Sequence, residues 1–213
     1  MNLDIGLPAA AAFLAGLAAV LTAAALVLAM APQRLIADHG LGPSPWTTRR
    51  AIGAISALAG LATAVLSIVM GRPDLAWRLG VCAAALSAVA LVDAVHLLVP
   101  DIYTALLAAV ALSWLPSVGL GHVLLGAATG GGLLALVRWL FKRVRGFEGL
   151  GFGDVKLMAA AGALAGPERT LWIIVAAAAL GLAWILIRKQ AAAPFAACAA
   201  APALMLLAFD KLS

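Results

Sequence analysis

The sequence predicts an all-α, polytopic integral membrane protein, and its composition and the grouping of its apolar residues support this fold class. Of its 213 residues, 65% are hydrophobic and 11% are charged, and the mean hydropathy is +1.11. Soluble domains have about 45–50% apolar and roughly 25% charged residues, so a soluble globular protein is excluded. The apolar residues form long stretches, and about 20 helical residues are needed to cross a hydrocarbon core of roughly 30 Å.

About eight hydrophobic segments follow one another along the chain, and we expect them to form a single transmembrane domain over residues 1–213. Residues 31–50 between the first two segments are a short polar connector with several turn-forming glycines and prolines. The segments span residues 5–30, 51–70, 75–92, 102–115, 118–137, 155–166, 170–187 and 191–209.

Three of these segments have distinctive lengths or compositions. Segments 102–115 and 155–166 are too short for an ordinary crossing, and their lengths are typical of re-entrant or partly buried helices. The fifth segment contains Gly126 and a run of glycines at 130–132. Small residues of this kind let two helix backbones approach closely, so we expect tight packing there.

The basic residues predict the orientation. If all eight segments cross, the loops after odd-numbered segments hold nine of the 14 Lys and Arg residues, and the opposite side holds three. By the positive-inside rule, the loops after odd-numbered segments face the cytoplasm and both termini face outward. The nine are Arg34, Arg49, Arg50, Arg138, Lys142, Arg143, Arg145, Arg188 and Lys189.

The cysteines and the net charge argue against two other classes of protein. Cys82 and Cys198 each lie in an apolar stretch without a Cys-x-x-Cys pair, so we expect no metal site and no disulfide framework. The net charge of +5 is the ordinary excess of cytoplasmic membrane loops, so we expect contacts with membrane lipid and none with nucleic acid.

Two aspartates lie where a membrane protein rarely places a charge. Asp93 closes the third apolar segment and Asp154 opens the sixth. An ionised carboxylate at the centre of a membrane helix costs about 2.5–3.5 kcal/mol, so such residues are candidates for function. Pro100 breaks the helix after Asp93, and Asp101 is placed to cap the next helix.

The residues before Asp154 form the run Glu148-Gly149-Leu150-Gly151-Phe152-Gly153. Its alternating glycines allow unusual backbone angles and the close approach of another chain, so an extended peptide could pair with it. We therefore expect Gly151, Phe152 and Gly153 to shape a substrate cleft, with Pro100 as a further residue of this cleft.

Both aspartates follow odd-numbered segments, so they lie on the cytoplasmic side at similar depth and can meet. Two carboxylates in one site cannot both ionise cheaply, and one keeps its proton. Such a pair can serve as general base and general acid toward a water that attacks a peptide carbonyl. Coupled carboxylates titrate together, so the sequence assigns the proton to neither.

The glycine run with Asp154 and the following Val155-Lys156-Leu157 resembles the signature of the prepilin peptidases, also called type IV leader peptidases. A second family element, an aspartate followed by a proline at the start of the next helix, matches Asp93 and Pro100. Pro194-Phe195 is similar to an element of the family's last helix, without the usual glycine after it.

The resemblance implies an enzyme whose catalytic pair is Asp93 and Asp154. It would cleave the basic leader of prepilins or pseudopilins just before their hydrophobic helix, in type IV pilus or type II secretion systems, at the cytoplasmic face of the inner membrane. It implies no metal and no cofactor for this reaction. Bifunctional members carry two Cys-x-x-Cys pairs between the first two helices, where residues 31–50 have no cysteine. We therefore expect no methyltransferase activity.

Two further residues are candidates for the substrate cleft. Glu148, the only carboxylate in its loop before the glycines, could contact a basic leader. Lys156 could lower the pKa of Asp154 or extend toward water. Two other functions use the same aspartates: a small proton- or cation-coupled transporter, and an inactive homologue that only binds pilins.

Overall fold

The computed structural model describes residues 49–69, 73–147, 149–189 and 192–212, and these are helical apart from short connections. The described ranges contain no strand, so the predicted all-α class is confirmed. Segment 5–30, nearly all of the 31–50 connector and Glu148 lie outside the described residues. The helices are α3 (Arg49–Val69), α4 (Pro73–His96), α5 (Asp101–Ser113), α6 (Leu115–Val118), α7 (Leu120–Ala127), the π-helix η2 (Ala128–Gly132), α8 (Leu133–Arg145), α9 (Phe152–Ala165), α10 (Pro167–Arg188) and α11 (Phe195–Leu212).

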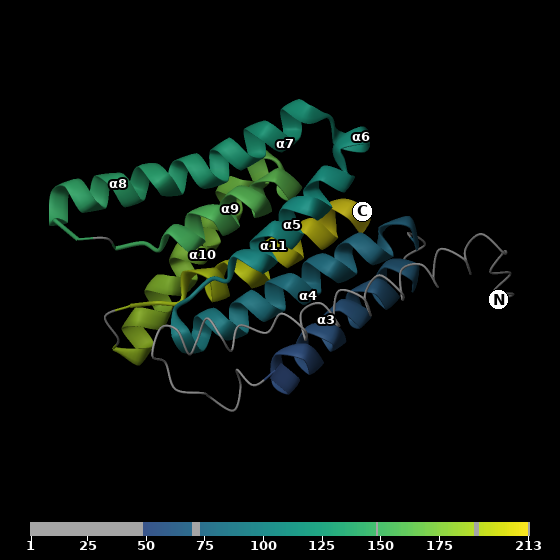
Figure 1. The fold of residues 1–213 in the computed structure, drawn as a ribbon, viewed down its shortest axis with the longest axis horizontal. Coiled ribbons are helices and arrows are strands. Elements are labelled where there is room, and N and C mark those ends of the chain that lie inside the picture. Colours follow the sequence, from purple (N-terminus) through teal and green to yellow (C-terminus); the bar gives the residue numbers. More distant parts are fainter. Residues whose placement is uncertain (1–48, 70–72, 148, 190–191, 213) are drawn as a thin grey trace, which may run out of the picture.

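The long helices run roughly side by side as a bundle (Figure 1). Helix α4 packs against α3, α5 and α11. Helix α9 contacts α5, α7, η2, α10 and α11, and ten of its 14 residues are buried. The helix whose first turn contains Asp154 is therefore among the most enclosed of the described helices, although it has only 14 residues.

Helices α7, η2 and α8 form one rod across α9, and glycines decide how closely the two approach (Figure 1). A side chain at Gly126 would collide with the backbone carbonyl of Gly162, and one at Gly130 would collide with the carbonyl of Met158. The expected close packing of the fifth segment is confirmed, because the two backbones touch where the side chains are absent.

Three described stretches are long and apolar enough to cross a membrane: Leu75–His96, Leu120–Arg145 and Pro167–Arg188. The two segments singled out as short are short helices, since α5 has 13 residues and α9 has 14. The expected number of about eight membrane segments stays a prediction.

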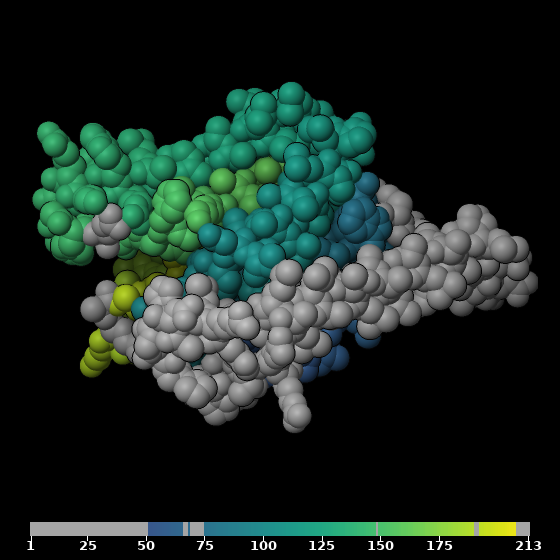
Figure 2. Space-filling model, viewed as in Figure 1, coloured from purple at the N-terminus to yellow at the C-terminus, as the bar shows by residue number. Residues whose placement is uncertain are grey.

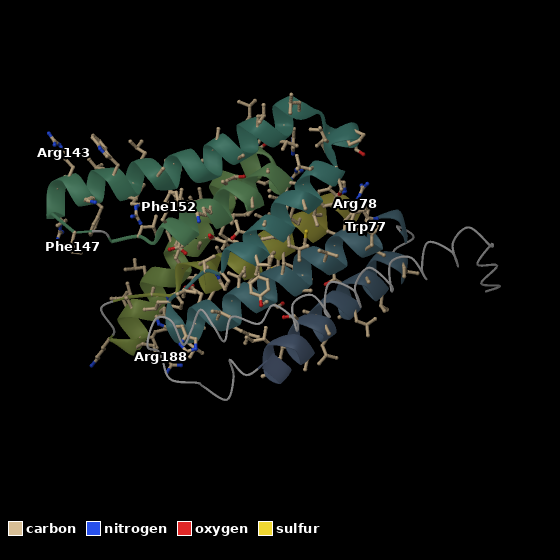
Figure 3. The ribbon with its side chains drawn as sticks, in the orientation of Figure 1. Trp77, Arg78, Arg143, Phe147, Phe152 and Arg188 are labelled. Atoms are coloured by element: carbon tan, nitrogen blue, oxygen red, sulfur yellow. The ribbon has the colours of Figure 1, made fainter. Side chains whose placement is uncertain are left out.

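The described cationic residues gather mainly at one end of the bundle. Figure 3 places Arg143 and Arg188 at the end where Phe152 opens α9, and Trp77 and Arg78 at the other end. Helix α8 carries three basic residues in its last turn, and α10 carries Arg188 in its last turn. The end of the bundle where α9 begins is therefore the more positive one.

Candidate active site

Asp93 lies in the last turn of α4 and is 3% exposed. Its carboxylate is bound by the start of another helix. The Oδ2 atom accepts a 2.9 Å hydrogen bond from the backbone amide of Ala197, and the amide of Ala196 donates a second bond to the carboxylate. These amides belong to the first turn of α11, where N–H groups have no partner within the helix. The N-terminus of α11 thus offsets the unfavourable position of a carboxylate at the C-terminus of α4.

Asp154 lies in the first turn of α9, whose N-cap residue is Gly151. Asp154 is 9% exposed, the backbone of Gly151 donates a hydrogen bond to its carboxylate, and its Oδ1 atom has no hydrogen-bond partner. Asp154 is outside the three candidate spans. Burial raises the pKa of its carboxyl from 3.8 to about 7, and the charge of Asp93 adds to the rise. A buried carboxyl with a free oxygen and a raised pKa can hold and release a proton near neutral pH.

Both aspartates line one cavity of about 470 Å³. The cavity is walled by the end of α4, the 149–151 loop, the first turn of α9, the second half of α10 and the start of α11. Its lining includes Gly149, Leu150 and Gly151, together with Ala177, Ala178, Gly181, Leu182 and Ile185 of α10 and Phe195 of α11. Apart from the two aspartates its side chains are apolar. A polar pair in an apolar pocket is the arrangement expected for a binding or catalytic site.

The glycines before Asp154 have separate roles in packing. A Cβ atom at Gly151 would lie 3.1 Å from Asp154 Oδ2, so the missing side chain leaves room for the carboxylate. A Cβ atom at Gly153 would lie 2.9 Å from Val99 Cβ, so this glycine lets α9 approach the segment that joins α4 to α5. Gly151 lines the cavity, whereas Gly153 is outside its lining.

Three other residues predicted to shape the cleft are also outside the cavity lining: Phe152, Pro100 and Lys156. Phe152 is 57% exposed, and the cationic groups of Arg138 and Lys156 lie 5.7 Å and 5.2 Å from its ring centre. Pro100 is the buried residue that precedes α5. Their contribution to substrate binding stays a prediction.

Lys156 forms a salt bridge of 2.8 Å with Asp101. The sequence left open whether Lys156 acts on Asp154 or extends toward water, and the structure gives it a partner on α5. The expected capping role of Asp101 is wrong, because α5 has no side-chain cap and its N-cap residue is Pro100.

The sequence missed the contribution of α10 to the cavity. Gly181 is buried there among alanines and leucines, and no polar residue marks this stretch as functional. The start of α11 was marked only by Pro194-Phe195. Pro194 precedes the helix, and its carbonyl accepts the first helical hydrogen bond, from Cys198. The amide of Ala197 therefore stays available for Asp93.

Comparisons with known proteins agree with the sequence motifs. The family model of the type IV leader peptidase family matches residues 80–186, just over half of the chain and a range that includes both aspartates. No solved structure gives a significant match.

Curated relatives carry the name prepilin leader peptidase/N-methyltransferase. The Pseudomonas aeruginosa protein is 36% identical over 144 residues, which are 62% of this chain and 48% of that protein. The Burkholderia pseudomallei protein is 40% identical over 110 residues, 48% of this chain and 35% of that one. The Xanthomonas campestris protein is 41% identical over 106 residues, 44% of this chain and 35% of that one. The matches thus span about half or less of each relative's length, and the chain belongs to the type IV leader peptidase family.

Proposed function

We propose that this protein is a membrane-embedded aspartic endopeptidase that removes the basic leader from type IV prepilins or pseudopilins. The observation that carries the proposal is that Asp93 and Asp154, on helices far apart in the sequence, line the same cavity. The family match and the names of the relatives support the choice of substrate class.

In the proposed reaction the two carboxyl groups share one proton. The ionised carboxylate accepts a proton from a bound water as the water oxygen attacks the carbonyl carbon of the substrate. The protonated carboxyl donates its proton to the carbonyl oxygen, which gives a tetrahedral diol. Collapse of this intermediate breaks the C–N bond, and the leaving amine takes up a proton from the dyad. The apolar walls of the cavity strengthen these electrostatic interactions by keeping the local dielectric low.

We also propose that the site faces the cytoplasm in a multi-pass protein of the inner membrane, built as one domain with about eight hydrophobic segments. The aspartates lie at the end of the bundle where α8 and α10 finish with basic residues. By the positive-inside rule this end is cytoplasmic. A basic leader on the cytoplasmic side would reach the cavity without crossing the bilayer.

The proposal is tested by reconstituting the protein in vesicles with a prepilin and following the shift in precursor mobility. We expect Asp93→Asn and Asp154→Asn each to slow cleavage by about 10²–10⁴-fold, the usual contribution of a general acid or base. Glu168→Gln is the matched control, because Glu168 is an exposed carboxylate in the first turn of α10, at the far end of α9 from Asp154. A precursor left intact by the unaltered protein, or cleaved at the normal rate by either Asn variant, would contradict the proposal.

A further inference from the structure

A second hollow lies on the other side of α9 from the aspartates. It has a volume of about 520 Å³ and is formed by α5, α7 and α9. In Figure 2, light-green atoms of α9 are visible between the teal atoms of α5 and the greener atoms of α7. We call this hollow the α5–α9 groove. It is lined by Asp101, Thr104, Ala105, Ala108, Ala111, Leu112, Val123, Ala127, Lys156, Ala159, Ala160 and Ala163.

The lining residues of the groove repeat with helical spacing. On α5 they fall at positions 101, 104, 105, 108, 111 and 112, and on α9 at 156, 159, 160 and 163. Each set is one face of its helix. The α5 face extends over about 16 Å at a rise of 1.5 Å per residue. Seven of the twelve lining residues are alanine. Small side chains at this spacing are typical of surfaces on which another membrane helix packs closely.

One buried polar group in the groove lacks a partner. Thr104 is 8% exposed, it lines the groove, and its hydroxyl oxygen has no hydrogen-bond partner. A buried polar atom without a partner costs free energy, so a ligand that supplied one would be favoured. Threonine hydroxyls bond across helix contacts in membranes, and a helix in the groove could supply a carbonyl or side-chain acceptor.

The charges at the groove favour an apolar occupant. Among its lining residues only Asp101 and Lys156 are charged, and they neutralise one another through their 2.8 Å salt bridge. The remaining surface carries no net charge. An anionic lipid headgroup would have to displace Asp101 from Lys156, whereas an apolar helix needs no such change.

The groove begins beside the candidate active site. Lys156, at its mouth, follows Asp154 by two residues, and residues two apart on a helix lie about 200° apart around the axis. The first turn of α9 therefore separates the cavity from the groove. A helix is about 10 Å across, a distance that roughly three extended residues span. A peptide bound at the aspartates can thus reach the groove after a few residues.

We infer that the α5–α9 groove binds the hydrophobic helix of the precursor that follows the cleaved bond. This inference rests on the proposed function. The leader and the scissile bond occupy the cavity, the next few residues pass over the start of α9, and the apolar helix lies against α5 and α9. The groove then selects substrates by the helix after the cleavage site and adds to the affinity for the whole precursor.

Two substrates distinguish an effect on binding of the precursor helix from an effect on bond cleavage. One is the full-length precursor, and the other is a short peptide that contains the leader and a few residues beyond the bond but no helix. We expect Ala105→Trp, at an exposed position in the groove, to lower kcat/KM for the precursor at least tenfold and for the short peptide less than twofold. Ala108→Leu is a milder second variant deeper in the groove. Ala179→Trp is the matched control, because Ala179 is exposed on α10 and lines neither hollow.

Unchanged precursor cleavage in both groove variants would overturn the inference, and so would equal losses on both substrates. If the unaltered protein cleaves neither substrate, the proposed function fails, and photo-crosslinking still tests the groove. A photoreactive residue at position 105 of the Asp154→Asn protein should crosslink to the helix of bound precursor, and one at position 179 should not. Crosslinks from position 105 to phospholipid alone would overturn the inference.

Discussion

The backbone amide of Ala197 donates a 2.9 Å hydrogen bond to Oδ2 of Asp93, joining residues 104 positions apart. The bond fixes the start of α11 against the end of α4 and supplies a donor to a buried carboxylate. Hydrogen bonds to charged groups contribute about 1.5–3 kcal/mol, roughly twice as much as neutral ones. We therefore regard the first turn of α11 as the positioning element for Asp93.

Removing this donor should slow the reaction without breaking the helix. Ala197→Pro deletes the amide hydrogen, and proline is tolerated in the first turn of a helix because amides there have no helical acceptor. We expect a loss of about tenfold or more in kcat for leader cleavage, from the 1.5–3 kcal/mol of the lost bond. Ala197→Ser, which keeps the amide, is the control. Equal rates in the proline variant and the unaltered protein would show that the bond does not position Asp93.

The pH dependence of cleavage should follow the proton that the two aspartates share. Burial raises the pKa of Asp154 to about 7, so its carboxyl keeps the proton below that pH and loses it above. A general acid must be protonated to act, so we expect kcat to fall as the pH rises through about 7. The measurement is a rate profile from pH 5 to 9 in proteoliposomes. Glu168→Gln should show the same profile, and a rate that is constant from pH 6 to 9 would argue against a titrating dyad.

The contact between Gly126 and Gly162 should be intolerant of even one methyl group. In Gly126→Ala the new Cβ atom would overlap the carbonyl oxygen of Gly162, and overpacking of this kind costs about 1–3 kcal/mol. We expect a lower thermal unfolding temperature in detergent. Gly132→Ala on the same rod is the control, because a Cβ there meets nothing within 4 Å. Its stability should be unchanged or higher by up to about 1 kcal/mol, since alanine favours helix over glycine.

The chain should cleave without methylating its product. The relatives are named for both activities, but residues 31–50 contain no cysteine with which to form the Cys-x-x-Cys pairs of bifunctional members. Incubation of the purified protein with cleaved pilin and labelled S-adenosylmethionine should therefore leave the pilin unlabelled. A bifunctional relative assayed beside it is the control, and label incorporated by this chain would refute the prediction.

The charge and glycine patterns could be interpreted from the sequence because their effects depend on residues that are close together in the chain. Long apolar runs predict helices in any arrangement, and the lengths of the short helices α5 and α9 followed directly. Asp93 and Asp154 were conspicuous because carboxylates beside apolar segments are costly unless they serve a function. The glycines at 126 and 130–132 predicted close packing. They did not predict that the backbone carbonyls of Gly162 and Met158 are the groups approached.

The sequence by itself determined the helical class, the family and the two aspartates as candidates. Only the tertiary structure decided that the amides of α11 bind Asp93, that Lys156 pairs with Asp101, and that α10 walls the cavity. These contacts join residues distant in the chain, mostly through backbone groups and through alanines, which occur in all of the described helices except α6. Hydropathy is a property of each segment alone, whereas the choice of neighbour depends on how all the helix surfaces fit together, and no single segment encodes that fit.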